Sequence, residues 1–115
     1  MKAMLTVSIL GALLATPVFA DCSAPDDTVQ IPNGTTATRD EMVQAQKAVK
    51  AFDAAVKAYS DCLTAEEDAK VAAGADRAKI HPEYAKLNNA EVDKVQQVAD
   101  KFNTERRAFK AKGAS

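Results

Sequence analysis

Apolar residues recur at heptad spacing through the middle of the chain. From residue 42 to residue 63 they are separated alternately by three and four positions, which predicts a helix that buries one stripe against a partner helix. Thr38-Arg39-Asp40-Glu41 precedes this stripe as a capping box, and Gly74 is suited to end the helix. The pattern therefore predicts a first helix over residues 38–73. Its apolar stripe comprises Met42, Ala45, Val49, Phe52, Val56, Tyr59 and Leu63.

A second helix is predicted over residues 82–112, because Pro82 and Glu83 suit a first helical turn. His81 would then lie in the link, as the residue that leads into this helix. The short link favours antiparallel neighbours, so we expect an all-α, two-helix hairpin in which Phe52 lies near Phe102. The second stripe comprises Tyr84, Leu87, Val92, Val95, Val98, Ala99, Phe102 and Phe109.

The first twenty residues are typical of an export signal. Lys2 precedes an uncharged apolar stretch from Met4 to Ala15, and small residues lie at the positions that a signal peptidase recognises, with cleavage after Ala20. This stretch is too short for a comfortable membrane span, which needs roughly 20 apolar residues. Asp21 separates the cleavage site from Cys22, which argues against a lipid anchor. We therefore expect a periplasmic protein without a stable membrane anchor after signal cleavage.

Residues 21–37, with two prolines and an Asn33-Gly34 turn signal, are expected to form an extended arm before a helical hairpin domain at 38–115. Cys22 and Cys62 are the two cysteines, and an oxidising compartment favours their pairing. Geometry permits it: Cys62 lies roughly 36 Å along the first helix, and the arm can reach about 53 Å when extended. We predict a disulfide between Cys22 and Cys62 that fastens the arm to the first helix.

The spacing of these cysteines belongs to a longer pattern between Cys22 and Leu63. The arm contains Ile31-Pro32-Asn33-Gly34. The first helix contains Glu41-Met42 and, at the end of the pattern, Tyr59-Ser-Asp-Cys-Leu63. This pattern resembles small uncharacterised exported proteins of Gram-negative bacteria, with a C-x-P…IPxG…EM…VKxY/F…YxxCL arrangement. The resemblance implies a periplasmic location and supports the disulfide, and it implies no activity.

Charge and residue types argue against several functions. The chain has 15 Lys and Arg against 16 Asp and Glu, spread along its length, so we expect no nucleic-acid partner. The nearest basic cluster, Arg106, Arg107, Lys110 and Lys112, fits the cations that the end of a helix favours. With His81 as the single histidine, no catalytic triad can be assembled, and we expect no metal site, since zinc sites normally take three or four protein ligands. We expect no enzyme activity, no catalytic residue and no cofactor.

Three functions stay open for an exported hairpin. It could act through protein–protein contacts, as a structural protein, an adaptor or an accessory subunit of the cell envelope. It could bind a small molecule or peptide between arm and hairpin, or it could be a holdase-like chaperone. A line of alanines on the first helix favours a homodimer or an exported protein partner, although alanine is also simply the best helix former. This alanine line comprises Ala48, Ala51, Ala55 and Ala58.

Overall fold

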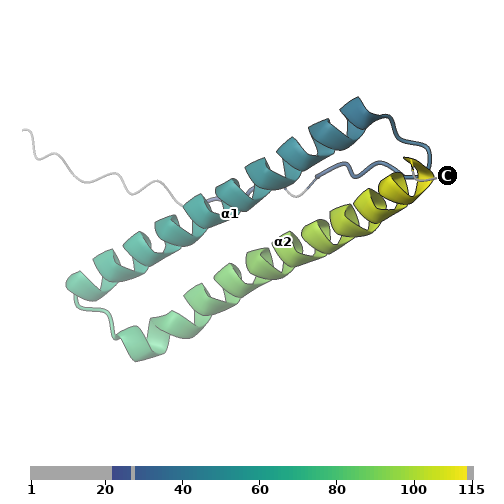
Figure 1. Ribbon diagram of the computed structural model, residues 1–115. Helices are drawn as coiled ribbons and strands as arrows, with labels where there is room; N and C mark the ends of the chain where they lie inside the picture. The colour runs from purple at the N-terminus through teal and green to yellow at the C-terminus, as the bar shows by residue number, and fades with distance from the viewer. Residues whose placement is uncertain (1–21, 27, 114–115) are drawn as a thin grey trace, which may run out of the picture.

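The computed structural model describes residues 22–26 and 28–113 of the chain. They form two helices, α1 (Arg39–Ala72) and α2 (Arg77–Gly113), which lie side by side and run in opposite directions (Figure 1). The all-α antiparallel hairpin is confirmed, and the described residues contain no strand. No helix among them is long and apolar enough to cross a membrane. The expected export signal, residues 1–20, lies outside the described residues.

The ends of α1 follow the predicted signals. The Thr38 side chain accepts a hydrogen bond from the backbone N–H of Glu41 at 3.1 Å, and Glu41 Oε2 accepts from the Thr38 N–H at 2.8 Å. This reciprocal capping box satisfies backbone donors that the first turn of a helix leaves unpaired. At the other end Gly74 adopts a φ of 109°, a left-handed conformation that glycine reaches without a steric penalty.

The start of the second helix differs from the expectation. α2 begins at Arg77, not at Pro82, because Asp76 caps it: the Asp76 Oδ1 accepts a hydrogen bond from the Ala78 N–H at 3.0 Å. Pro82 therefore lies inside the helix, where its missing N–H leaves the exposed Ala78 carbonyl without its usual partner. His81 likewise lies within α2 and not in the link.

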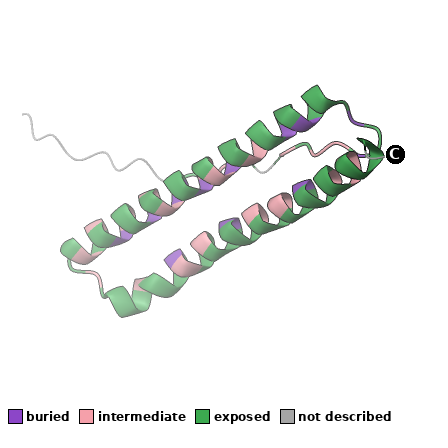
Figure 2. Cartoon of the chain, in the orientation of Figure 1, coloured by how far each residue is buried: buried purple, intermediate pink, exposed green. Residues whose placement is uncertain are grey.

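Buried side chains gather in a cluster near each end of the hairpin. In Figure 2 the buried positions lie on the sides of the helices that face each other. The predicted α1 stripe is confirmed, since all its members are buried except Val49, which is half-buried. The cluster where α1 begins contains Ala37, Met42, Ala45 and Phe102, with Ile31, Val49 and Phe109 against it. The cluster near the link contains Tyr59, Leu63 and Tyr84, with Cys22 and Ile80 against it.

The apolar stripe predicted for the second helix was wrong in part. The side chains of Leu87 and Val92 are 46% and 38% exposed, whereas Glu91 is only 4% exposed. Glu91 lies at the heptad position that continues the spacing of Val95, and α2 therefore turns a carboxylate toward α1. The helix register also differs, because Phe102 packs with Met42 and Ala45 while Phe52 belongs to neither cluster.

Candidate functional site

The arm is fastened to the hairpin at both of its ends. The predicted disulfide joins Cys22 to Cys62 of α1, with a Cα–Cα distance of 5.8 Å, inside the usual range for such bonds. At the other end the chain turns at Asn33, whose carbonyl accepts hydrogen bonds from the backbone N–H groups of Thr36 and Ala37 at 3.2 and 2.8 Å. Between these two points the arm runs back along α1 (Figure 1).

The turn packs unusually close to α2 at Gly34. The Gly34 N–H donates a hydrogen bond to Glu105 Oε2 at 2.6 Å. A Cβ atom at residue 34 would lie 1.9 Å from the backbone carbonyl oxygen of Glu105, which is far inside van der Waals contact. Only glycine allows the backbone of the turn to come so close to α2. The turn therefore leads into α1 and also packs against α2.

A groove of about 980 Å³ lies between the arm and α1. Its floor is α1 and includes Phe52 and three members of the predicted alanine line. Val29 and Ile31 form an apolar wall on the arm. Most side chains of this floor are alanines, which are small. Space therefore remains between the arm and α1. The α1 residues of the floor are Ala45, Ala48, Ala51, Phe52 and Ala55.

Carboxylates surround this apolar floor. Asp26 of the arm and Asp40 and Glu41 of α1 line the groove, together with Thr28, Gln30 and Gln44. Hydrogen bonds from the side chain and then the backbone of Thr28 lower the pKa of Asp26 below its ordinary value of 3.8. The rim is therefore negatively charged at neutral pH. Its polar groups suit contact and recognition.

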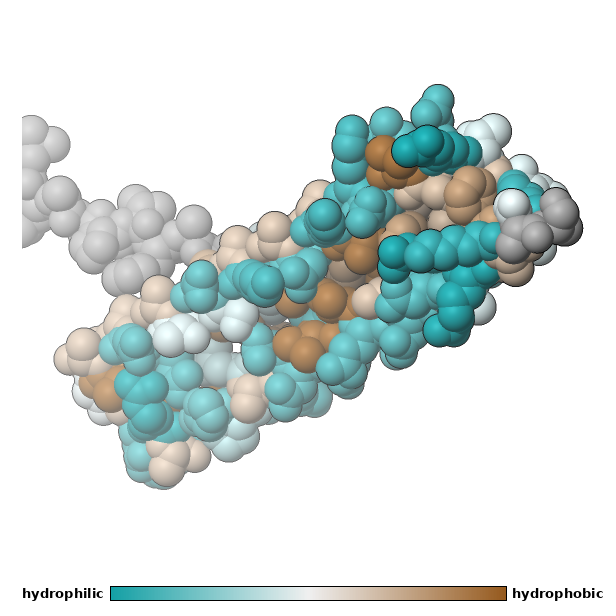
Figure 3. Space-filling model, in the orientation of Figure 1, coloured by the Kyte–Doolittle hydropathy of each residue, from teal (hydrophilic) through white to brown (hydrophobic). Residues whose placement is uncertain are grey.

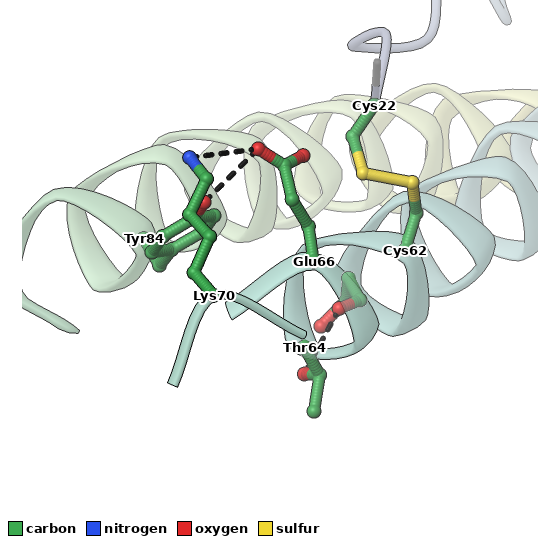
Figure 4. The surroundings of a disulfide bond; sticks show 7 residues. Cys22, Cys62, Thr64, Glu66, Lys70 and Tyr84 are labelled. Carbon is green, nitrogen blue, oxygen red and sulfur yellow. Dashed lines mark hydrogen bonds and ion pairs between the residues drawn. A yellow bond between two sulfur atoms is a disulfide. The ribbon is translucent and has the colours of Figure 1, made fainter. Parts of the chain in front are cut away.

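A second group of polar residues adjoins the disulfide. The Tyr84 hydroxyl donates a hydrogen bond to Glu66 Oε1 at 3.0 Å, and Lys70 Nζ lies 3.1 Å from the same oxygen (Figure 4). Hydrogen bonds from Lys70 and then Tyr84 lower the pKa of Glu66 below its ordinary value of 4.5. Lys70 also lies 5.2 Å from the centroid of the Tyr84 ring. This network ties α1 to α2 beside Cys22.

His81 contacts a buried carboxylate across the hairpin. Its Nδ1 lies 2.8 Å from Glu67 Oε1, and Glu67 is only 5% exposed. Arg77 Nη1 lies 3.5 Å from the same oxygen, and Arg77 Nη2 lies 2.8 Å from Asp68. His81 thus helps to close the link between the helices. Among residues 22–26 and 28–113 no three His, Cys, Asp or Glu side chains converge as a metal site would require.

The predicted basic cluster at the end of α2 divides into two pairs. Lys112 donates a hydrogen bond to the Ala37 carbonyl at 2.5 Å, and Arg107 donates to the Thr104 hydroxyl at 3.3 Å. The side chains of Lys112 and Arg107 therefore make hydrogen bonds within the hairpin. Arg106 and Lys110 instead line a hollow with Arg39 from the start of α1, a neighbour that the sequence did not indicate.

Two polar side chains of α2 face the interior of the hairpin. Asn88 Oδ1 and Glu91 Oε2 are buried and have no hydrogen-bond partner among the described residues. The other carboxylate oxygen of Glu91 lies 3.1 Å from Lys94 Nζ. The sequence indicates their inward position, because Asn88 and Glu91 continue the alternating spacing of three and four residues of Val95, Val98 and Phe102. Glu105 continues the same spacing after Phe102. Neither orphaned acceptor lies in the arm–α1 groove.

Comparison of the chain with models of protein families, with curated proteins and with solved structures finds no match.

Proposed function

We propose that this protein is a non-catalytic periplasmic module that acts through contact with a second protein, and that the groove between the arm and α1 is its contact surface. The observation that carries the proposal is the composition of this groove. Apolar side chains form its floor and one wall, and carboxylates line its rim. A groove of this kind suits an apolar segment of a partner that also carries basic residues.

The two anchors of the arm support this proposal. The disulfide and the Gly34–Glu105 contact hold the arm at a fixed separation from α1. The arm therefore loses less conformational entropy when a partner binds. A disulfide is also compatible with the oxidising compartment that the export signal predicts. The partner would be a second copy of the chain or another exported protein.

Photo-crosslinking tests this proposal with a matched pair of positions. Ala51 and Ala54 are both exposed on α1, but only Ala51 lines the groove. A photoreactive phenylalanine analogue at residue 51, activated in intact cells, is expected to give a discrete protein adduct, whereas the same analogue at residue 54 gives none. An adduct of twice the chain mass identifies a homodimer, and another mass identifies an exported partner. Equal labelling at residues 51 and 54, or none at either, would refute the proposal.

Binding of a small molecule or a free peptide is the second candidate. Its support is the groove volume of about 980 Å³, which is near the upper end of the range for ligand pockets, about 300–1,000 Å³. Thermal shift measurements against fractionated periplasmic extract distinguish it from the first candidate. A stabilising activity that passes a small-molecule filter and disappears in Ala51→Glu would favour this candidate over a protein partner.

The holdase alternative has less support. A holdase needs a broad exposed apolar face, and the exposed large apolar side chains among the described residues are scattered over the two helices at Val43, Leu87 and Val92. Light scattering by an aggregating client, with and without the protein near equimolar ratio, tests it directly. Suppression of aggregation would revive the chaperone hypothesis at the expense of the contact module.

A further inference from the structure

A second hollow lies at the open end of the hairpin, and its lining residues come from α1 and α2. It has a volume of about 340 Å³ and forms where α1 begins and α2 ends. Four of its residues belong to α1: Met42 is part of the buried stripe, and Arg39, Val43 and Gln46 lie on the side of that stripe opposite to the polar and alanine residues of the arm–α1 groove. The two hollows are therefore separate surfaces.

The base of this hollow is apolar. Met42 and Phe102 belong to the buried cluster at this end, and Phe109 packs against that cluster. Val43 extends the apolar surface outward, since its side chain is 39% exposed. Figure 3 shows apolar surface between the two helices with polar side chains on both sides. A ligand placed here would cover apolar atoms that the hairpin itself leaves accessible to water.

Three cations surround this apolar base. Arg39 comes from α1, and Arg106 and Lys110 come from α2. None of the three makes a hydrogen bond or an ion pair with another residue in the described part of the chain, in contrast to Arg107 and its bond to Thr104. Their positive charge is therefore available to a ligand.

The helix dipole does not account for this arrangement. A cation such as Lys110 is favoured in the last turn of α2, where the partial charge of the helix end is negative. Arg39 is the first residue of α1, where the partial charge is positive and an acidic residue would be favoured. Its position places a third positive charge beside the other two at a small electrostatic cost.

We propose that this hollow binds a single-chain anionic amphiphile, with its carboxylate between Arg39, Arg106 and Lys110 and its alkyl chain over Met42, Val43 and Phe102. Arginine matches a carboxylate with two parallel hydrogen bonds, which favours this head group. The volume of about 340 Å³ suits one chain of medium length better than a large ligand. The proposal goes beyond the proposed function and is independent of the arm–α1 groove.

Titration of the disulfide-bonded mature protein with decanoate, below the concentration at which decanoate forms micelles, tests this proposal. Amide chemical shifts in residues 39–46 and 102–110 are expected to change along one saturable curve. Decanol, which has the chain without the charge, and acetate, which has the charge without the chain, should each bind at least about tenfold more weakly. Binding of decanol or acetate as strong as that of decanoate would overturn the proposal.

Two neighbouring arginines provide a matched pair of variants. Arg106→Gln is expected to weaken decanoate binding about tenfold, whereas Arg107→Gln leaves it within about twofold, because only Arg106 lines the hollow. Val43→Ser, at an exposed position, should weaken binding by removing part of the apolar surface. Equal effects of Arg106→Gln and Arg107→Gln would overturn the proposed site. So would sedimentation with anionic phospholipid vesicles without any response to monomeric decanoate, since that result indicates a membrane surface as the ligand.

Discussion

The backbone N–H of Gly34 donates to the side chain of Glu105 across 71 residues of sequence. This contact joins the turn at the end of the arm to the C-terminal part of α2, so both helices and the arm meet there. With the disulfide at the other end of the arm, it fixes the position of the arm over α1. The arm–α1 groove depends on these two contacts.

Gly34→Ala is expected to destabilise the fold by about 2 kcal/mol or more, because the added Cβ would lie 1.9 Å from the Glu105 carbonyl oxygen and backbone must move. Urea denaturation of the oxidised protein measures this loss. Gly113→Ala is the control, since a Cβ there meets no atom within 4 Å. Similar unfolding midpoints for the two variants would contradict the close approach of the turn to α2.

Reduction of the Cys22–Cys62 disulfide is expected to lower the free energy of unfolding by up to about 4 kcal/mol, since the bond closes a loop with a sequence separation of 40. Thermal melts with and without a dithiol reductant measure this change. The far-ultraviolet circular dichroism signal should persist at low temperature, because the core clusters consist mainly of contacts between α1 and α2. Cys22→Ser/Cys62→Ser should not respond to reductant. A melting temperature of the native protein that is insensitive to reductant would contradict the structural role of the bond.

Glu91→Leu is expected to raise the free energy of unfolding by about 1–2 kcal/mol, although it removes the contact with Lys94. The native carboxylate is buried with Oε2 unpaired, and an unsatisfied buried polar group costs about 1–3 kcal/mol. Glu83→Leu, on the exposed surface of the same helix, should stay within about 0.5 kcal/mol of the native protein. Denaturation in urea compares the three proteins. Destabilisation by Glu91→Leu would show that the carboxylate stabilises the hairpin.

Acid should remove the contribution of Glu66 to stability. Its pKa is lowered in the folded protein, first by Lys70 and then by Tyr84, so the unfolded chain binds its proton more readily. The contribution is fully present above the ordinary pKa of 4.5 and is lost as the pH falls through the lower pKa of the folded state. Glu66→Gln should therefore lose less stability than the native protein between pH 6 and about pH 3. Parallel losses over this range would show that the network beside the disulfide does not stabilise the ionised carboxylate.

The first helix was predictable because its buried positions from Met42 to Leu63 are all apolar; the buried carboxylate of Glu67 comes only after this stripe. Its capping box and Gly74 also use signals that depend only on neighbouring residues. The second helix was harder, since Asn88 and Glu91 occupy inward positions where a core pattern predicts apolar residues. Its start was misplaced because Pro82 suits a first turn, while the actual cap, Asp76, lies among other polar and small residues.

The candidate site was predictable only in outline. The expectation that cysteines pair in an oxidising compartment, together with the reach of the arm, was sufficient to predict the disulfide that the structure contains. The sequence left open whether the alanine line is a contact surface, and its position on the floor of the arm–α1 groove depends on the path of the arm between its anchors. The contact between Gly34 and Glu105 depends on helix register, which a sequence with polar seam positions leaves undetermined.

Native mass spectrometry of the protein, purified from a periplasmic extract without reductant, detects the disulfide and a bound partner in one experiment. We expect the mass of Asp21 to Ser115 less two hydrogens, in a complex with a second copy or with another exported chain. The missing hydrogens report the disulfide, and the complex reports a partner. A reduced monomer that carries nothing would contradict both the fastened arm and its role in protein contact.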